Sequence, residues 1–126
     1  MKIKIIKLIL KYVLGVFFAL AGLNHFINPV FYLKIMPPYL PWHAFLVYLS
    51  GFFEVVFGIL VLLPEYTRIG AWGIIAVLIA VTPANLHMAQ HPQFYADIPP
   101  WALWLRLPLQ LVLIAWAYWY TDKHAS

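Results

Sequence analysis

The chain has 126 residues, of which 65% are hydrophobic, 10% are charged and none is cysteine. An average soluble domain has about 25% charged residues, so 8 Lys and Arg with 4 Asp and Glu cannot cover the surface of a soluble protein of this size. The lack of cysteine excludes disulfides, thiol redox relays and cysteine-ligated zinc or iron–sulfur sites. The net charge of +4 does not indicate nucleic-acid binding, because the basic residues lie at predicted helix ends and not along one face.

Four segments meet the requirement for a transmembrane helix, which is about 20 mostly apolar residues. They are residues 5–26, 43–63, 69–88 and 101–120. Pro64 and the polar residues after it predict a short turn between the second and third segments. Short connections make neighbouring helices antiparallel. We therefore predict one all-α domain over residues 1–126, a four-transmembrane-helix bundle.

The basic residues predict the orientation of this bundle. Lys34 lies on one side, and the other basic residues near the helix ends lie on the opposite side: Lys2, Lys4, Lys7, Lys11, Arg68 and Lys123. By the positive-inside rule both termini are expected in the cytoplasm. Lys7 and Lys11 are expected to extend to the headgroups. A secretory signal ending at residues 19–21 is an alternative for the first segment.

A short motif occurs in both predicted outer loops. In residues 28–38 and 91–100 a Pro, a Phe-Tyr pair, an Ile and a Pro-Pro pair follow in the same order, with one gap at Met36. The repetition predicts a duplicated helical hairpin with a pseudo-twofold axis along the membrane normal. Coincidence in loops rich in proline and aromatic residues is the alternative. Each copy is expected to form a short re-entrant or interfacial segment over the outer mouth of the bundle.

Polar side chains inside the predicted spans gather between the outer surface and the mid-plane. Arg106 lies about 8 Å along its span at 1.5 Å per residue, and Glu54 lies near the centre of another. Charged groups in a span usually face the bundle interior or a cavity. Either Glu54 and Arg106 form an ion pair that clamps two helices, or the cluster is a ligand site with Glu54 as the candidate catalytic residue. The ligand-binding candidates are Asn24, His25, Glu54, Asn85, His87, Arg106 and Gln110.

The histidines also raise the question of a metal. His25, Glu54 and His87 would supply two imidazoles and one carboxylate, the donor set of non-haem iron sites. His87 and His91 are spaced i, i+4 and could chelate a metal by themselves. Asn85 and His87 point about 200° apart on a helix, so we expect only one of them to face a cavity. The spacing does not require a metal, and metal binding is the weaker hypothesis.

Two prolines lie inside the spans. Pro83 and Pro108 each remove one helical hydrogen bond and leave the carbonyls of Ile79 and Trp104 free. Free carbonyls at membrane depth are tolerated where other helices, water or a cavity satisfy them. Both positions are therefore expected to widen the outer half of the bundle.

Taken together, several segments resemble the DoxX family of small bacterial membrane proteins. They are residues 21–26, residues 32–41, Ser50 and Gly51 with Glu54, residues 83–88 and residues 104–110. The resemblance implies a four-helix protein of the bacterial inner membrane. Some members of the family are associated with a thiosulfate:quinone oxidoreductase and others with oxidative-stress assemblies. The chain has no thiosulfate-binding or flavin motif, so the resemblance implies an architecture more than a reaction.

The leading functional hypothesis is a polar pocket, open to the outer leaflet, for a quinone or a similar lipophilic molecule. Phe52, Phe53 and Trp104 are predicted to form its walls, and Glu54 to carry protons. Electron transfer would require a cofactor or an oxidoreductase partner subunit. The alternatives are a non-catalytic scaffold or partner subunit with a structural polar cluster, and a small transporter formed by a homo-oligomer. Transport needs polar groups in both halves of the bundle, and the inner half has almost none.

Overall fold

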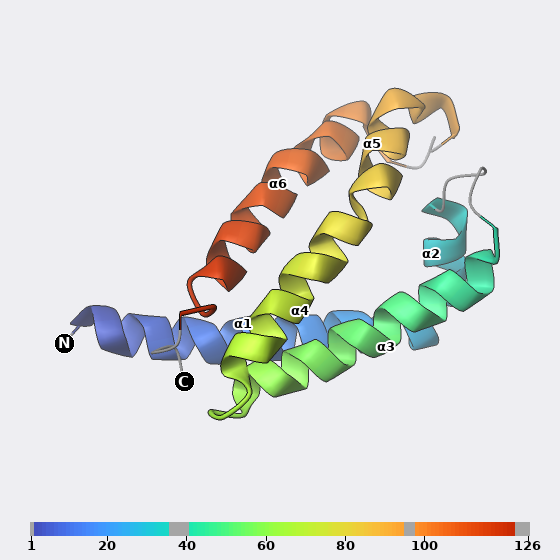
Figure 1. The fold of residues 1–126 in the computed structure, drawn as a ribbon. Helices are drawn as coiled ribbons and strands as arrows, with labels where there is room; N and C mark the ends of the chain where they lie inside the picture. Colours follow the sequence, from blue (N-terminus) through green and yellow to red (C-terminus); the bar gives the residue numbers. More distant parts are fainter. Residues whose placement is uncertain (1, 36–40, 95–97, 123–126) are drawn as a thin grey trace.

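The computed structural model describes residues 2–35, 41–94 and 98–122. In chain order the elements are α1 (Lys2–Ile27), α2 (Pro29–Ile35), α3 (His43–Leu62), α4 (Thr67–Ala80), α5 (Thr82–Gln90), the 3-10 helix η1 (Pro92–Phe94) and α6 (Pro100–Tyr118) (Figure 1). Four helical stretches are long and apolar enough to cross a membrane: α1, α3, α4 with α5, and α6. These stretches confirm the predicted all-α, four-helix architecture of a multi-pass membrane protein.

The third span consists of two helices. The sequence predicted a single helix over 69–88. α4 ends at Ala80 and α5 begins at Thr82. Pro83 lies in the first turn of α5. N–H groups in the first turn have no partner within the helix, so the missing N–H of proline costs no helical hydrogen bond there. Pro108, in contrast, lies inside α6 without ending it. The fourth span ends at Tyr118, two residues before the predicted end.

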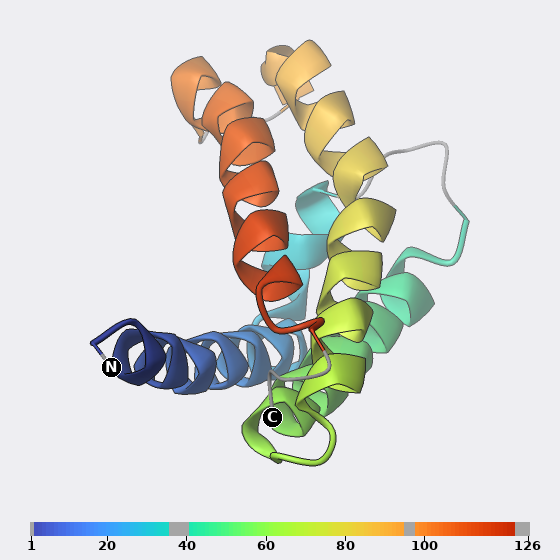
Figure 2. The same ribbon diagram turned by 60° about the vertical axis from the view of Figure 1, so that its left-hand side comes forward.

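The helices form two hairpins that diverge from one end of the molecule. Figures 1 and 2 show α1 beside α3 and the α4–α5 stretch beside α6. Residues 63–66 connect the hairpins, and we call this the turn end. The opposite end, the α2/η1 end, carries a short helix in each hairpin: α2 between α1 and α3, and η1 between α5 and α6. Both hairpins therefore have the element order that the repeated motif predicted. Residues 36–38 and 95–97 of that motif lie outside the described residues, as does Lys123.

Glycines allow α1 and α3 to touch along their backbones. A Cβ atom added to Gly22 would lie 2.5 Å from the carbonyl oxygen of Gly51, and one added to Gly58 would lie 2.6 Å from the backbone nitrogen of Ala19. A Cβ atom on Gly51 would lie 2.6 Å from the Cβ atom of His25. Small residues at such crossings permit the closest helix packing in membranes. Here they also place His25 directly against α3.

Two apolar clusters lie at the two ends of the molecule. The larger one, at the turn end, joins α1, α3, α4 and α6 through buried residues that include Leu14, Val61, Ile74 and Ala117. The smaller one joins α5 and α6 at the α2/η1 end through Met88, Ala89 and Leu103. The hairpins are thus packed together at the turn end.

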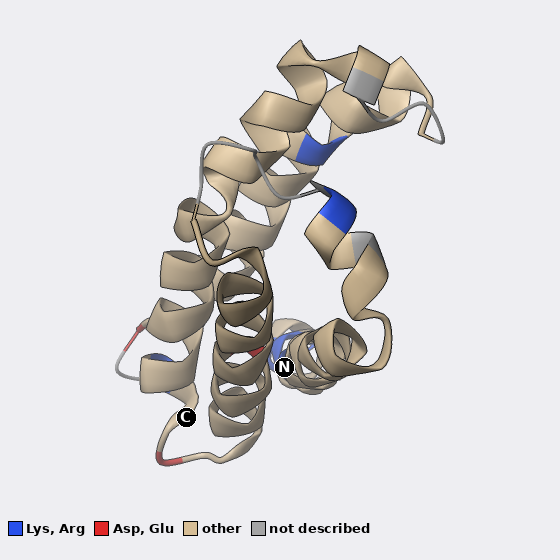
Figure 3. Cartoon of the chain, turned by 90° about the vertical axis from the view of Figure 1, so that its right-hand side faces the viewer, with Lys and Arg blue, Asp and Glu red and all other residues tan. Residues whose placement is uncertain are grey.

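The outward faces of the helices are apolar. Leu111 and Trp101, for example, are 66% and 69% exposed, and Figure 3 shows how few charged residues the helices carry. A surface of this kind suits lipid and not water. Lys11 does not extend outward as predicted: it is buried, and its Nζ atom lies 5.6 Å from the centroid of the Tyr12 ring.

We predict that Gly51→Ala destabilises the protein by about 1–3 kcal/mol, because the added methyl group must displace His25 or separate α1 from α3. The midpoint of thermal unfolding in detergent measures the effect. Ala76→Val enlarges an exposed side chain of α4 and serves as the control, with little change expected. Equal behaviour of the two variants would contradict the close contact at Gly51.

Candidate functional site

A cavity of about 310 Å³ lies between the two hairpins. Five of the seven ligand-binding candidates predicted from the sequence line it: His25, Glu54, Asn85, Arg106 and Gln110. Tyr32 of α2 also lines it. The other lining residues are apolar: Phe17, Phe18, Ala21, Leu78, Val81, Leu109 and Leu113. The structure therefore brings most of the predicted polar residues, from separate helices, around one space.

The cavity opens at the side of the molecule. Phe17 of α1 and Leu109 of α6 both line it, and about half of each residue is exposed, 50% and 52% respectively. The opening therefore lies between α1 and α6 on the apolar outer surface. A molecule dissolved in lipid could enter there without passing through water.

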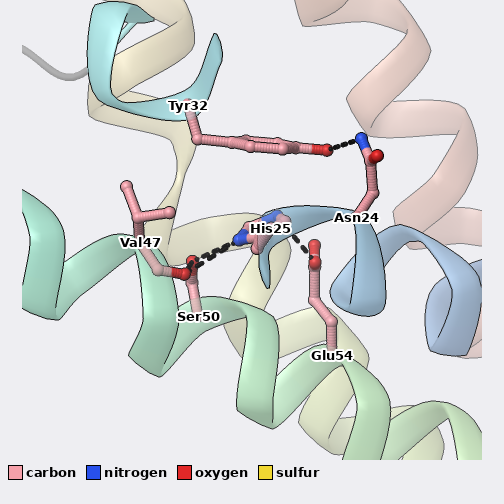
Figure 4. A network of polar contacts seen from close by, with 6 residues as sticks. All are labelled: Asn24, His25, Tyr32, Val47, Ser50 and Glu54. Atoms are coloured by element: carbon pink, nitrogen blue, oxygen red, sulfur yellow. Dashed lines mark hydrogen bonds and ion pairs between the residues drawn. The ribbon is translucent and has the colours of Figure 1, made fainter. Parts of the chain in front are cut away.

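His25 links α1 to α3 through both of its ring nitrogens (Figure 4). Nδ1 lies 2.9 Å from the carbonyl oxygen of Val47 and 3.1 Å from Ser50 Oγ, and Nε2 lies 3.0 Å from Glu54 Oε2. A carbonyl oxygen can only accept, so Nδ1 carries a hydrogen atom and donates it. Apart from the contact with His25, Glu54 Oε2 has no hydrogen-bond partner in the described part of the chain.

Tyr32 covers the histidine from the side of α2. Its ring lies against the imidazole with a centroid distance of 3.9 Å and an angle of 31° between the ring planes, and its hydroxyl oxygen accepts a 2.7 Å hydrogen bond from Asn24 Nδ2 (Figure 4). Asn24 Oδ1 in turn accepts from Asn28 Nδ2 at 2.8 Å. Asn24 does not line the cavity. It holds Tyr32 in place, so its role is indirect and differs from the predicted contact with a ligand.

A second polar network lies on the opposite wall and joins α4, α5 and α6. Gln110 donates through Nε2 to the carbonyl of Leu78, at 2.8 Å, and to the hydroxyl of Thr82, and it accepts from Asn85 Nδ2 at 2.7 Å. Asn85 Oδ1 accepts a 3.1 Å hydrogen bond from Arg106 Nε. The network satisfies the backbone beside the α4–α5 break. The position of Pro83 had predicted a free carbonyl at Ile79. The carbonyl that accepts the hydrogen bond from Gln110 is instead that of Leu78, the residue before it.

The ion pair between Glu54 and Arg106, one of the two alternatives for this polar cluster, does not form. Within the described ranges, the ion pair that forms is His25 with Glu54, and the hydrogen-bond partner of Arg106 is Asn85. Glu54 and Arg106 line the same cavity from opposite hairpins, and no contact of 4.0 Å or less joins them. The divergence of the hairpins explains the difference, because it places the cavity where the clamp was expected.

His87 does not join the site. It is buried, its ring stacks on that of His91 with a centroid distance of 4.4 Å, and it does not line the cavity. Asn85 does line the cavity, which confirms that only one of these two α5 residues faces it. Among the described residues no group of three His, Asp or Glu side chains could hold a metal ion. The predicted triad of His25, Glu54 and His87 is therefore not formed.

The apolar walls also differ from those predicted. Phe52, Phe53 and Trp104 are 54%, 38% and 53% exposed and do not line the cavity. The walls come instead from Phe17 and Phe18, about two turns before His25 at 3.6 residues per turn, and from Leu109 and Leu113. Tyr32 was singled out as part of the repeated motif and of the segments that resemble the DoxX family. Neither pattern indicated that the Tyr32 ring would lie against a histidine.

We predict that Glu54→Gln lowers the stability of the protein less than Glu54→Leu. Glutamine can donate from its amide to His25 Nε2, whereas leucine leaves a buried polar atom without a partner, at a cost of about 1–3 kcal/mol. The free energy of unfolding of both variants in the same detergent measures the difference. Equal losses would mean that the His25–Glu54 contact does not stabilise the fold.

We also predict that a double-mutant cycle detects coupling between Arg106 and Asn85. Arg106→Gln with Asn85→Ala is expected to show an interaction free energy of at least about 0.5 kcal/mol, because each variant removes the same hydrogen bond. Arg106→Gln with Glu54→Gln is the matched control and is expected to show a smaller value. Stronger coupling of Arg106 with Glu54 would contradict the partners seen in the structure.

Comparison with known proteins identifies a family and no function. The sequence matches no curated protein and no solved structure. A family model described as a domain of unknown function, DUF8561, matches residues 14–121, which include parts of all four spans. The chain belongs to this family, DUF8561.

Proposed function

We propose that the chain is a DoxX-like protein of the bacterial inner membrane whose cavity binds a lipid-soluble molecule with a polar head, such as a quinone, within an oxidoreductase system. The supporting observation is the cavity itself, which combines apolar walls, a few convergent polar groups and an opening between α1 and α6. Mostly apolar pockets with a small number of placed polar groups are typical of small-molecule sites.

The polar groups suit the head of such a molecule. A quinone accepts hydrogen bonds at its carbonyl oxygens, and the terminal nitrogens of Arg106 can donate to one of them. The volume of about 310 Å³ lies at the lower end of the range for ligand pockets, about 300–1,000 Å³. It would enclose a head group and leave a long apolar tail among the lipids.

The distribution of charge supports an orientation with both termini in the cytoplasm. The turn end and the start of α1 lie on the same side of the bundle and carry Lys2, Lys4, Lys7 and Arg68. The α2/η1 end carries Lys34. Under the positive-inside rule the α2/η1 end then faces the outside of the cell. In this orientation the cavity opens into the outer half of the bilayer, as expected for exchange with molecules dissolved there.

Two alternatives remain as hypotheses with different support. The Asn85–Gln110 network joins three helices, so part of the polar cluster has a structural role. This observation favours a scaffold or a partner subunit. A transporter is less well supported, because the turn end is closed by a packed apolar core. Electron transfer in the proposed function would come from a partner subunit. The residues of this chain would bind and orient the ligand.

We predict that a short-tailed quinone raises the thermal unfolding midpoint of the purified protein. At a ligand concentration about one hundred times the Kd, the stabilisation is expected to reach about 2.7 kcal/mol. Ala21→Trp fills the cavity and is expected to abolish the effect. Leu20→Trp adds the same ring to the lipid-facing side of α1 and is expected to preserve it. Equal stabilisation of both variants would place quinone binding outside this cavity.

A further inference from the structure

The charged groups around the cavity do not balance. Arg106 reaches it from α6, and its hydrogen bond is made by Nε to Asn85 Oδ1. Neither terminal nitrogen of the guanidinium has a hydrogen bond within residues 2–35, 41–94 and 98–122, and no carboxylate of these residues forms an ion pair with it. Arginine is charged at all relevant pH values, so its positive charge faces the cavity without a counter-ion from the described chain.

The His25–Glu54 pair does not supply that counter-ion. Nδ1 of His25 donates to the Val47 carbonyl, so Nε2 presents a bare lone pair unless it is protonated. A bare lone pair 3.0 Å from a carboxylate oxygen would be repelled, so one proton must lie between Nε2 and Oε2. The pair is then either imidazolium with carboxylate or imidazole with carboxylic acid. Both forms have zero net charge, which leaves the cavity with one positive charge.

The guanidinium is also held in position. Asn85 accepts from Nε while its own amide donates to Gln110 Oε1, and Gln110 is anchored on the Leu78 carbonyl. This chain of bonds fixes one edge of the arginine fork and leaves its terminal nitrogens available. A planar fork with available donors matches the paired oxygens of a carboxylate or a phosphate.

We infer that the cavity binds the anionic head of a single-chain amphiphile, with a carboxylate or phosphate on Arg106. This inference rests on the lipid-accessible cavity of the proposed function and assigns its ligand an anionic head in place of the neutral head of a quinone. The polar end of the cavity, with Arg106 and His25, lies toward the α2/η1 end. Phe17 and Phe18 lie about two turns before His25 on α1, and Leu113 lies about two turns after Arg106 on α6, at 3.6 residues per turn. A tail leaving the head would therefore pass these apolar residues and reach lipid through the opening at Phe17 and Leu109.

Hexadecyl phosphate and hexadecanol provide the test, because they share a tail and differ in the charge of the head. Each is titrated into the purified full-length chain in nanodiscs of neutral phosphatidylcholine, and bound ligand is counted by native mass spectrometry. Hexadecyl phosphate is expected to bind at least about tenfold more tightly, a difference of about 1.4 kcal/mol. Arg106→Gln is expected to remove the preference, and Arg106→Lys to retain part of it. Lys34→Gln is the matched control: it removes one positive charge from an exposed residue of α2 and is expected to leave the preference unchanged.

The outcomes separate this inference from the proposed function. Equal binding of the two probes to the wild-type chain, which requires no variant, would overturn the anionic head and leave a lipophile-binding cavity. If inorganic phosphate bound as tightly as hexadecyl phosphate, the site would recognise a free anion. That result would overturn the inference of an amphiphilic ligand. Failure of both long-chain probes and of the quinone to bind would overturn the proposed function as well. An unchanged preference in a folded Arg106→Gln variant would exclude Arg106 as the head-group residue.

Discussion

The close contact between α1 and α3 is the constraint on which the site depends. With Gly22 and Gly51 at the crossing, no side chain separates the two backbones, and His25 must lie along α3 instead of between lipid tails. There its two nitrogens find the Val47 carbonyl and Glu54. A buried polar ring in an apolar environment is costly unless both nitrogens are satisfied. The glycines therefore decide the partners of the histidine as well as the distance between the helices.

The cavity follows from the way in which the two hairpins are joined. The apolar cluster at the turn end holds α1, α3, α4 and α6 together, while the opposite ends diverge (Figures 1 and 2). The hydrogen bonds of each wall then form within one hairpin: His25 bonds with Glu54, and Asn85 bonds with Gln110 and with Nε of Arg106. Because none of these bonds crosses from one wall to the other, the space between the walls can remain open to a ligand.

Much of the architecture could be predicted because it follows from local properties of the chain. Hydropathy and length predict the four spans, and the repeated proline and aromatic motif predicts a short element in each hairpin. The break at Val81 was missed because Pro83 is compatible with either a kink or a new helix start. Similarly, an ion pair between Glu54 and Arg106 was one of the two alternatives for the polar cluster, because opposite charges attract. The separation of the hairpins, which cancels that attraction, leaves no trace in the sequence.

The amino-acid sequence by itself determined a four-helix membrane protein with its polar side chains gathered toward one end, because the cost of burying charge in lipid acts on every residue wherever its neighbours lie. It also identified five of the polar residues that line the cavity, out of seven ligand-binding candidates. Only the tertiary structure decided that Glu54 pairs with His25, that Tyr32 covers them and that His87 turns away. Hydrogen bonds reach about 3 Å, so their partners depend on where the helices cross and how far they diverge.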